Sequence, residues 1–207
     1  GEIQVLVGTQ MVAKGHDFPN VTLVGVLHAD AALRLPDFRS GERTFALLTQ
    51  VSGRAGRGDR PGRVLVQTFT PDHDVIRYAL QHDFEGYARR VMRSREALRY
   101  PPFGRLAMIR LSHRDGDAAR DAARAVGDAV RGAVRAAGGR AAGFKVLGPS
   151  PSPLRRIGGR NRMQLFVVAA GPRALGAVLD AADEAIVAVA RRAGVRLAVD
   201  IDPRSMM

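Results

Sequence analysis

The feature that most restricts how this 207-residue chain can fold is the segment YPPFG at residues 100–104. Consecutive prolines cannot continue a helix, because each lacks a backbone N–H and crowds the residue before it. Apolar residues between Pro71 and Leu98 recur at near-helical spacing, so one or two helices are predicted there and must end at the prolines. We therefore expect a domain boundary here, with residues 1–99 on one side and residues 100–207 on the other.

The first part alternates between strand and helix signals. Short apolar runs predict strands at residues 3–7, 21–27 and 62–69, with a helix at residues 45–57. This β-α-β order is typical of α/β proteins. The run at residues 21–27 is almost wholly apolar, which predicts a strand of a parallel sheet with helices on both faces.

The second part has a different order of elements. Strands are predicted at residues 106–111, 144–147, 163–169 and 195–201, helices at residues 115–137 and 172–193, and a basic loop at residues 149–160. The resulting β-α-β-β-α-β order is that of the ferredoxin-like α+β plan. Glycines at positions 138, 139 and 194 lie where the two helices should end.

Charge is unevenly distributed along the chain. The formal net charge is +12, and residues 1–100 carry 14 basic and 11 acidic groups whereas residues 101–207 carry 18 and 9. The second part is therefore the better surface for a polyanion. Lys14 and Lys145 are the only lysines, an arginine bias that a GC-rich genome explains without reference to function.

Several classes of protein are disfavoured by what the sequence lacks. It has no cysteine, hence no disulfide or thiolate zinc site, which fits a reducing compartment. Its five histidines show no H-x-x-x-H spacing, so no metal site is predicted. No apolar run is long enough to span a membrane and no signal-peptide pattern is present, so we expect a cytoplasmic protein with no membrane partner.

The most specific chemical signal is QVSGRAGR at residues 50–57. In a helix, Gln50, Gly53, Arg54 and Arg57 would share one face. Glycine in a helix is unfavourable by about 1 kcal/mol, which suggests that a ligand approaches the backbone closely. Arginine suits a phosphate ligand, because its planar fork donates two parallel hydrogen bonds and keeps its charge. A G-R-x-G-R fragment alone is a weak signal, since such clusters also occur in loops and RNA-binding tails.

Longer motifs place this signal in a family. QVSGRAGR resembles the arginine-finger motif in the second RecA-like lobe of superfamily 2 helicases, and GTQMVAKGHDFPN at residues 8–20 resembles motif five of the same superfamily. With DFRSGER, YPPFGRLAMIRL, VLGPSPSPL and the closing DIDPRSMM, essentially the whole chain resembles the C-terminal portion of the PriA family of replication-restart helicases, also called primosomal protein N′. The resemblance implies a partial RecA-like helicase lobe at residues 1–99, followed by a ferredoxin-like DNA-binding domain.

The resemblance also implies roles for residues of the first part. Arg57 would be the arginine finger, Arg54 its partner on the γ-phosphate and Gln50 the residue that positions them. The nucleotide-facing set would include Gly15, Asp17 and Gly53.

Thr9 and Gln10 would contact a DNA phosphate from a strand end, where open α/β sheets place their ligands, and Lys14 would add a further phosphate contact. The alternative is that Thr9 and Asp17 cap a turn and that Lys14 is an ordinary surface lysine.

In the second part, the basic segment LRRIGGRNR at residues 154–162 is the main candidate for DNA binding. Its four arginines could reach successive phosphates, with an affinity that depends on salt: Arg155, Arg156, Arg160 and Arg162. The family usually has an aromatic residue where this chain has Asn161, which does not offer the same stacking surface for a base. The alternative is a solvated hairpin tip. A solvated helix face likewise explains the arginines between residues 89 and 95.

The sequence does not contain a complete site for ATP. It has no G-x-x-x-x-G-K-[ST] loop, and its only Asp-Glu pair, Asp183-Glu184, falls on the surface of a predicted helix. Positioning and charge neutralisation provide most of the catalysis of phosphoryl transfer, so this chain alone is not expected to hydrolyse ATP. By resemblance, ATP and Mg²⁺ would be bound together with an upstream lobe, and zinc only by an upstream cysteine-rich region.

Two functions remain open. The first is an ATP-driven 3′-to-5′ DNA helicase that binds forked and single-stranded DNA and helps to load the replicative helicase. The second is a non-catalytic, fork-binding scaffold for primosome assembly. The resemblance implies as partners primosome proteins, the replicative helicase or its loader, and single-stranded-DNA-binding protein. We expect a nucleoid-associated monomer. A different superfamily 2 helicase is a third possibility, against which residues 100–104 and 146–153 argue.

Overall fold

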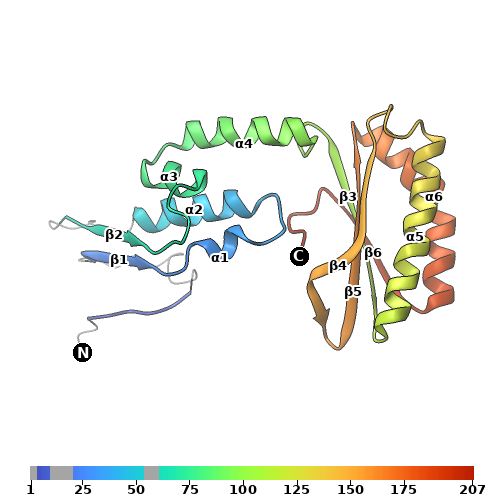
Figure 1. Cartoon of the computed structure of the whole chain (residues 1–207), viewed down its shortest axis with the longest axis horizontal. Helices are drawn as coiled ribbons and strands as arrows, with labels where there is room; N and C mark the ends of the chain where they lie inside the picture. The colour runs from blue at the N-terminus through green and yellow to red at the C-terminus, as the bar shows by residue number, and fades with distance from the viewer. Residues whose placement is uncertain (1–3, 10–20, 54–60) are drawn as a thin grey trace. The chain divides into compact units, whose positions relative to one another are not determined.

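The computed structural model describes residues 4–9, 21–53 and 61–207. These residues form a mixed α/β protein with two separate sheets (Figure 1). The chain divides into two compact units, Gly1–Arg90 and Val91–Met207. None of the helices in the described ranges combines the length and the apolar character needed to cross a membrane.

Two parallel strands form the sheet of the first unit. β1 (Leu23–Val26) and β2 (Arg63–Val66) pair along their whole lengths, which confirms shortened forms of the predicted strands at residues 21–27 and 62–69. The helices α1 (Asp30–Leu33) and α2 (Ser40–Ser52) lie between these strands in the sequence, and α3 (Asp74–Leu80) follows β2.

Two expectations for this unit are wrong. Described residues 4–7 form no strand, and Val5 and Val7 are 78% and 85% exposed. A strand needs a second backbone to satisfy its hydrogen bonds, and neither β1 nor β2 pairs with this run. The sheet is also not covered on both faces within the described part, because Leu23 and Leu65 are 57% and 61% exposed.

Helix α2 begins earlier than predicted because of Asp37. The Asp37 side chain accepts a hydrogen bond from the backbone N–H of Arg39 at 2.9 Å and forms an ion pair with Arg43 at 3.0 Å. It thereby holds the residues that lead into the first turn, and the helix starts at Ser40. The described part of α2 ends at Ser52, so residues 54–57 of the predicted helix lie outside the described residues.

Aromatic side chains join α2 to the helices that follow β2. Phe45 stacks on Tyr87 with 4.3 Å between ring centroids and 12° between planes, and Tyr78 packs beside Tyr87. Leu48 and Ile76 are buried in the same unit. Such stacked pairs stabilise a core by about 0.5–1.5 kcal/mol beyond the burial of their area.

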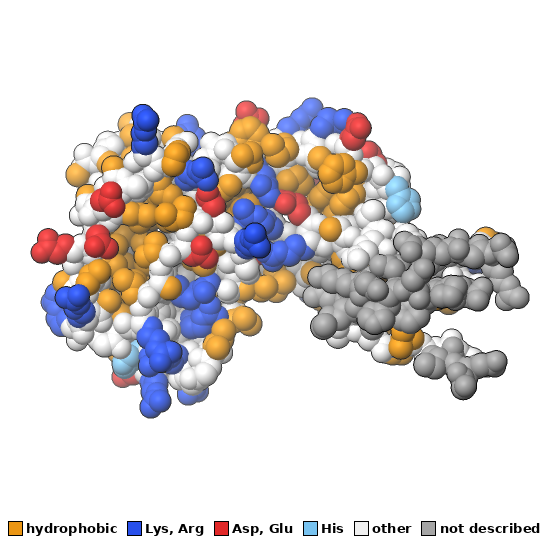
Figure 2. Space-filling model, turned by 180° about the vertical axis from the view of Figure 1, so that it is seen from behind, with side chains coloured by type: hydrophobic (Ala, Val, Ile, Leu, Met, Phe, Trp, Pro, Cys, Tyr) orange, Lys and Arg blue, Asp and Glu red, His pale blue; other side chains and the backbone are white. Residues whose placement is uncertain are grey.

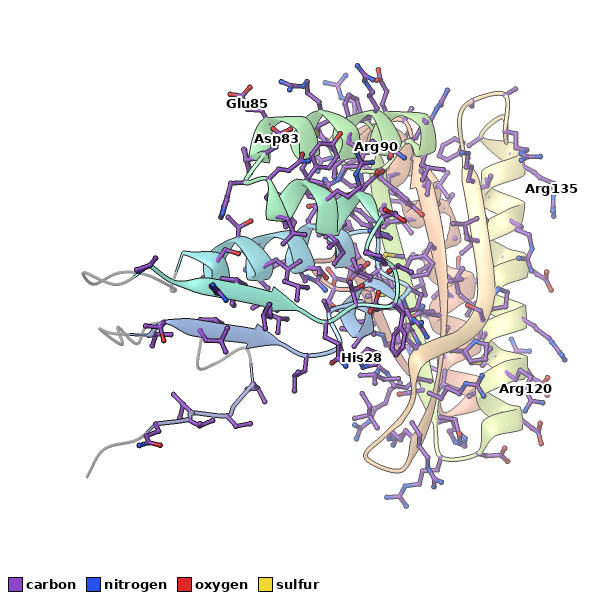
Figure 3. All side chains as sticks on the ribbon, turned by 60° about the vertical axis from the view of Figure 1, so that its left-hand side comes forward. His28, Asp83, Glu85, Arg90, Arg120 and Arg135 are labelled. Carbon is purple, nitrogen blue, oxygen red and sulfur yellow. The ribbon has the colours of Figure 1, made fainter. Side chains whose placement is uncertain are left out.

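Helix α4 (Phe84–Leu98) confirms that the segment before the prolines contains two helices, α3 and α4. On α4, Arg89 pairs with Glu85 at 3.3 Å and Arg90 pairs with Asp74 at 2.9 Å. Figure 3 shows Glu85 and Arg90 on this helix. These exposed pairs favour the interpretation of a solvated helix face.

The second unit is built on a four-stranded antiparallel sheet. Its elements follow the predicted order: β3 (Arg105–His113), α5 (Gly116–Ala136), β4 (Lys145–Ile157), β5 (Arg160–Ala169), α6 (Pro172–Ala193) and β6 (Arg196–Ile201). The strands lie in the order β4-β5-β3-β6, and both helices cover one face of the sheet (Figure 1). The core between them is fully apolar and includes Ile109, Leu165, Val126 and Val178.

Capping residues explain why the predicted bounds of the two helices in this unit agree closely with the structure. The Asp115 side chain accepts hydrogen bonds from the backbone N–H groups of Asp117 at 2.7 Å and Ala118 at 3.4 Å, which starts α5. Helix α6 starts at Pro172 and ends before Gly194, which has a φ of +61°. These are sequence signals that act locally, so they can be read without a structure.

The predicted basic loop at residues 149–160 is wrong. β4 extends to Ile157, and only Gly158 and Gly159, with φ of +53° and +74°, form the turn into β5. The prolines at 149, 151 and 153 resemble loop signals, but β4 is an edge strand, where a missing N–H can face away from the ladder. The strand also contains irregularities between Leu147 and Ser150 and between Pro151 and Arg156.

Candidate nucleic-acid interface

The β4–β5 hairpin presents two arginines to solvent. Arg155 and Arg156 are both exposed, and neither forms an ion pair or a side-chain hydrogen bond with any described residue. Neighbouring residues of a strand point to opposite faces, so the two guanidinium groups extend to both sides of the hairpin. The hairpin turn lies at the lower end of the sheet in Figure 1, and basic side chains are concentrated in the lower part of this unit in Figure 2.

The other two arginines of the basic segment have structural partners. Arg160 is half-buried, and its Nη1 donates to the carbonyl oxygen of Ser112 at 3.5 Å. Arg162 is only 8% exposed, and its Nη1 donates to the carbonyl oxygen of Leu154 at 3.3 Å. The structure therefore separates four arginines that look alike in sequence into two exposed, one half-buried and one buried. DNA contacts by all four stay a prediction.

Exposed apolar residues lie beside the exposed arginines. Leu154 and Ile157 are 50% and 51% exposed, and both lie on β4 next to Arg155 and Arg156. Sequence reasoning missed them, although the pattern of two arginines between two aliphatic residues was visible. Apolar side chains flanked by arginine can pack against bases or sugars of a nucleic acid.

Asn161 takes a structural role beside the hairpin turn. Its Nδ2 donates to the carbonyl oxygen of Arg114 at 2.8 Å, which ties β5 to the turn before α5. Asn161 also pairs with Arg156 across the hairpin. The hydrogen-bonded side chain presents no ring on which a base could stack.

A polar cluster lies on the sheet face opposite the helices. Arg110 on β3 is in register with Gln164 on β5, and its Nη2 donates to the carbonyl oxygen of Met207 at 2.9 Å. Burial lowers the pKa of Arg110, the charge of Arg162 lowers it further, and Asp200 opposes the shift. Among described residues, the buried atoms Arg110 Nε and Gln164 Oε1 have no hydrogen-bond partner. The sequence did not reveal this cluster, because its residues come from different strands and are brought together only by the register in which those strands pair.

In the first unit, the structure describes three of the residues that were predicted to contact the nucleotide or DNA. Gln50 lies on α2 and is half-buried, and the Gly53 N–H donates to the carbonyl oxygen of Thr49 at 3.1 Å where the helix ends. Thr9 is exposed. The remaining predicted residues lie outside the described part of the chain: Gln10, Lys14, Gly15, Asp17, Arg54 and Arg57. The shared face of Gln50, Arg54 and Arg57 therefore stays a prediction.

A buried carboxylate that sequence reasoning missed connects α1 to the loop after β2. Asp30 is 2% exposed and accepts hydrogen bonds from the hydroxyls of Thr68 and Thr70 and from the backbone N–H of Phe69. The Thr70 hydroxyl contributes most to lowering the Asp30 pKa, and the Phe69 N–H contributes next. This network holds the carboxyl ends of the two parallel strands together, where open α/β sheets bind ligands.

An apolar cavity of about 380 Å³ lies at the same end of β1, between α1 and α2. Its lining includes Leu27, Leu35, Leu47 and Leu48.

No cluster of three or more histidine and acidic side chains in the described ranges is placed to hold a metal ion.

Comparison with known proteins identifies the family. Residues 96–204 of this chain, which include the four-stranded sheet and its arginine-bearing hairpin, match the family described as Primosomal protein N C-terminal domain. The chain belongs to this family. The resemblance carried by its motifs is thereby confirmed.

Relatives match beyond the family segment. The chain is 43% identical over 207 residues to the replication restart protein PriA of Bacillus subtilis (strain 168), a match that covers all of this chain and 25% of that protein. It is 37% identical over 207 residues to the protein of the same name from Treponema pallidum (strain Nichols) and 35% identical over 206 residues to that of Haemophilus influenzae. The chain spans 30% and 27% of the length of these two proteins.

Proposed function

We propose that this chain is the C-terminal part of a replication-restart protein and binds branched or forked DNA through the β4–β5 hairpin. The observation that carries the proposal is the pair of exposed guanidinium groups, Arg155 and Arg156, which have no described partner to neutralise them. The excess of basic residues in the second part of the chain and the names of the relatives support it. Phosphate contacts from such a hairpin would position the protein without reading base sequence.

The fold supports a finer assignment of the two units. The second unit would be a ferredoxin-like domain, because its strands and helices follow the β-α-β-β-α-β order and its helices share one face of the sheet. The first unit would be the end of a RecA-like lobe, because it contains a parallel strand pair with a helix in the connection. We place the functional boundary between these two parts at the predicted position, between residues 99 and 100.

In the full-length protein, the first unit would complete an ATP site shared with an upstream lobe. Arg57 and Arg54 would stabilise charge on the transferred phosphoryl group, and Gln50 would hold them in position. Gly15, Asp17 and Gly53 would line the nucleotide side, and Thr9, Gln10 and Lys14 would contact DNA. ATP hydrolysis would drive 3′-to-5′ unwinding and help to load the replicative helicase.

A non-catalytic scaffold for primosome assembly is the second candidate. The only Asp-Glu pair in the sequence, Asp183-Glu184, lies on α6 and not within the motifs of the first unit, so this sequence offers no Asp-Glu box beside those motifs. The upstream sequence discriminates between the two functions: a phosphate loop with an Asp-Glu box favours the helicase, and the lack of both favours the scaffold.

The test of DNA binding is the salt dependence of affinity for a forked duplex. Each lost duplex phosphate contact reduces the slope of log K against log salt by roughly 0.9, so replacing Arg155, Arg156 and Arg160 with alanine should reduce it by up to about three units. Arg173→Ala, at an exposed site on α6, is the matched control and should leave the slope unchanged. An unaltered slope in the triple variant would remove the hairpin from the interface.

A further inference from the structure

The two edges of the four-stranded sheet differ in how they are protected. β4 forms one edge and β6 forms the other. β4 contains prolines at 149, 151 and 153, which remove N–H donors, and its pairing with β5 has two irregularities. β6, with the sequence RLAVDI, has no proline and pairs with β3 in one unbroken register. Prolines and irregularities are devices that keep a free edge from pairing, so the edge of β6 is open to another strand.

The backbone groups of β6 point to this edge at alternate residues. The Asp202 N–H donates to the carbonyl oxygen of Leu106 at 2.7 Å, so these two residues form a hydrogen-bonded pair. Hydrogen-bonded and non-hydrogen-bonded pairs alternate along an antiparallel ladder, so the even-numbered residues of β6 bond to β3. The odd-numbered residues direct their N–H and C=O groups to the free edge, where no strand of the described chain pairs with them.

The odd-numbered residues of β6 also carry aliphatic side chains, on the face of the sheet that the helices cover. Their register partners on β3, which include Ile109 and Leu111, belong to the core. Leu197 packs against that core, whereas Val199 is 46% and Ile201 is 56% exposed. The core therefore extends to the edge of the sheet and ends at two aliphatic side chains that a neighbouring strand would cover.

The charged residues of β6 form a self-complementary pattern. Arg196 and Asp200 are exposed on the opposite face of the sheet, each two residues from Ala198. Asp200 interacts electrostatically with Arg110 on β3, but neither Arg196 nor Asp200 forms an ion pair with a described residue. When two copies of β6 run antiparallel with Ala198 facing Ala198, Arg196 of each copy lies opposite Asp200 of the other. Opposite charges at facing positions stabilise a strand pair, and like charges destabilise it.

The neighbouring registers do not match the charges in this way. The next register in one direction would place Arg196 opposite Asp202. The Asp202 carboxylate is already paired with Arg105, and it accepts a hydrogen bond from the backbone N–H of Leu106 at 3.0 Å. The next register in the other direction would place Arg196 opposite Ala198, which offers no charge. The register centred on Ala198 is therefore the one that the charges of β6 favour.

We propose that two copies of this chain associate through β6, antiparallel and centred on Ala198, so that their two sheets become one continuous sheet. Such a contact is isologous, because each copy contributes the same surface. Facing residues lie on the same face of a sheet, so the helices of both copies cover one face and the aliphatic side chains of β6 join the two cores. The proposal departs from the monomeric state expected from the sequence, and it is independent of DNA binding by the hairpin.

The first test is sedimentation velocity of the 207-residue chain at physiological salt and at concentrations up to about 0.2 mM, which detects a Kd in the micromolar range. We expect the mass to rise with concentration from 22.2 kDa toward twice this value. Arg196→Asp and Asp200→Arg each place like charges opposite one another, so each alone should raise the Kd of the dimer at least about tenfold. An equimolar mixture of the two variants restores opposite charges and should associate as the unaltered chain does. Arg173→Asp makes the same change of charge at an exposed site on α6 and should leave the Kd unchanged.

The second test changes the backbone instead of the charge. Val199→Pro removes an N–H that points to the free edge, so it should prevent association without removing a hydrogen bond to β3. Circular dichroism of each variant reports whether the fold is retained. If Val199→Pro does not fold, the mixture of the two charge variants still tests the proposal.

Three results would overturn the proposal. The first is an unaltered chain that stays at 22.2 kDa over the whole concentration range, which would leave the edge of β6 to a strand from another part of a longer protein. The second is a mixture of the Arg196→Asp and Asp200→Arg variants that associates no better than either variant alone. The third is a folded Val199→Pro variant that associates as tightly as the unaltered chain.

Discussion

The turn of the β4–β5 hairpin permits a test of how backbone conformation supports the candidate interface. Gly159 has a φ of +74°, and a Cβ added there would meet no atom within 4 Å. Gly159→Ala therefore changes the backbone energy without introducing a clash. An L-residue in the left-handed region costs about 1–2 kcal/mol, so we expect the free energy of unfolding to fall by about that amount.

Gly176 provides the matched control, because it lies in α6 and its added Cβ would likewise meet no atom within 4 Å. There the helical backbone suits alanine, so Gly176→Ala should raise the free energy of unfolding by up to about 1 kcal/mol. At about 4 °C per kcal/mol for a unit of this size, Gly159→Ala should lower the Tm by about 4–8 °C and Gly176→Ala should raise it by up to about 4 °C.

Thermal unfolding followed by circular dichroism measures both shifts. Gly159→Asn should cost less than Gly159→Ala, because asparagine tolerates the left-handed region better than most residues do. The reasoning from backbone strain would be refuted if Gly159→Ala left the Tm unchanged or raised it, or if both alanine variants shifted the Tm in the same direction.

Three further predictions concern the first unit. Asp30→Asn should lower the Tm near neutral pH, and because the folded pKa of Asp30 is depressed, the difference from the unaltered chain should shrink as pH falls below the ordinary value of 3.8. A difference that grew toward low pH would contradict this. Phe45→Ala removes a buried ring stacked on Tyr87 and should cost about 3–5 kcal/mol, measured by denaturant unfolding, whereas a loss below about 1 kcal/mol would mean that the stack is not part of the core. If the full-length protein is an ATPase, Arg57→Ala should abolish DNA-stimulated turnover while DNA binding is retained, and unchanged turnover would exclude the finger role.

The elements of the second unit were predictable wherever a local residue sets a boundary. Pro172 and Gly194 delimit α6, and Asp115 starts α5, so both helices could be read from the sequence. The full length of β4 could not be predicted from the sequence. Its prolines indicate a loop, unless the strand is already known to lie at the edge of a sheet. That position depends on which strands pair, which no local signal encodes.

The candidate site was only partly predictable for a similar reason. The arginines of the hairpin were visible in the sequence, but the sequence did not show that Arg162 is buried and donates to the carbonyl oxygen of Leu154, eight residues earlier on the other strand. Asp30 was missed because its partners Thr68 and Thr70 are 38 and 40 residues away. Contacts at such sequence separations are set by packing and register.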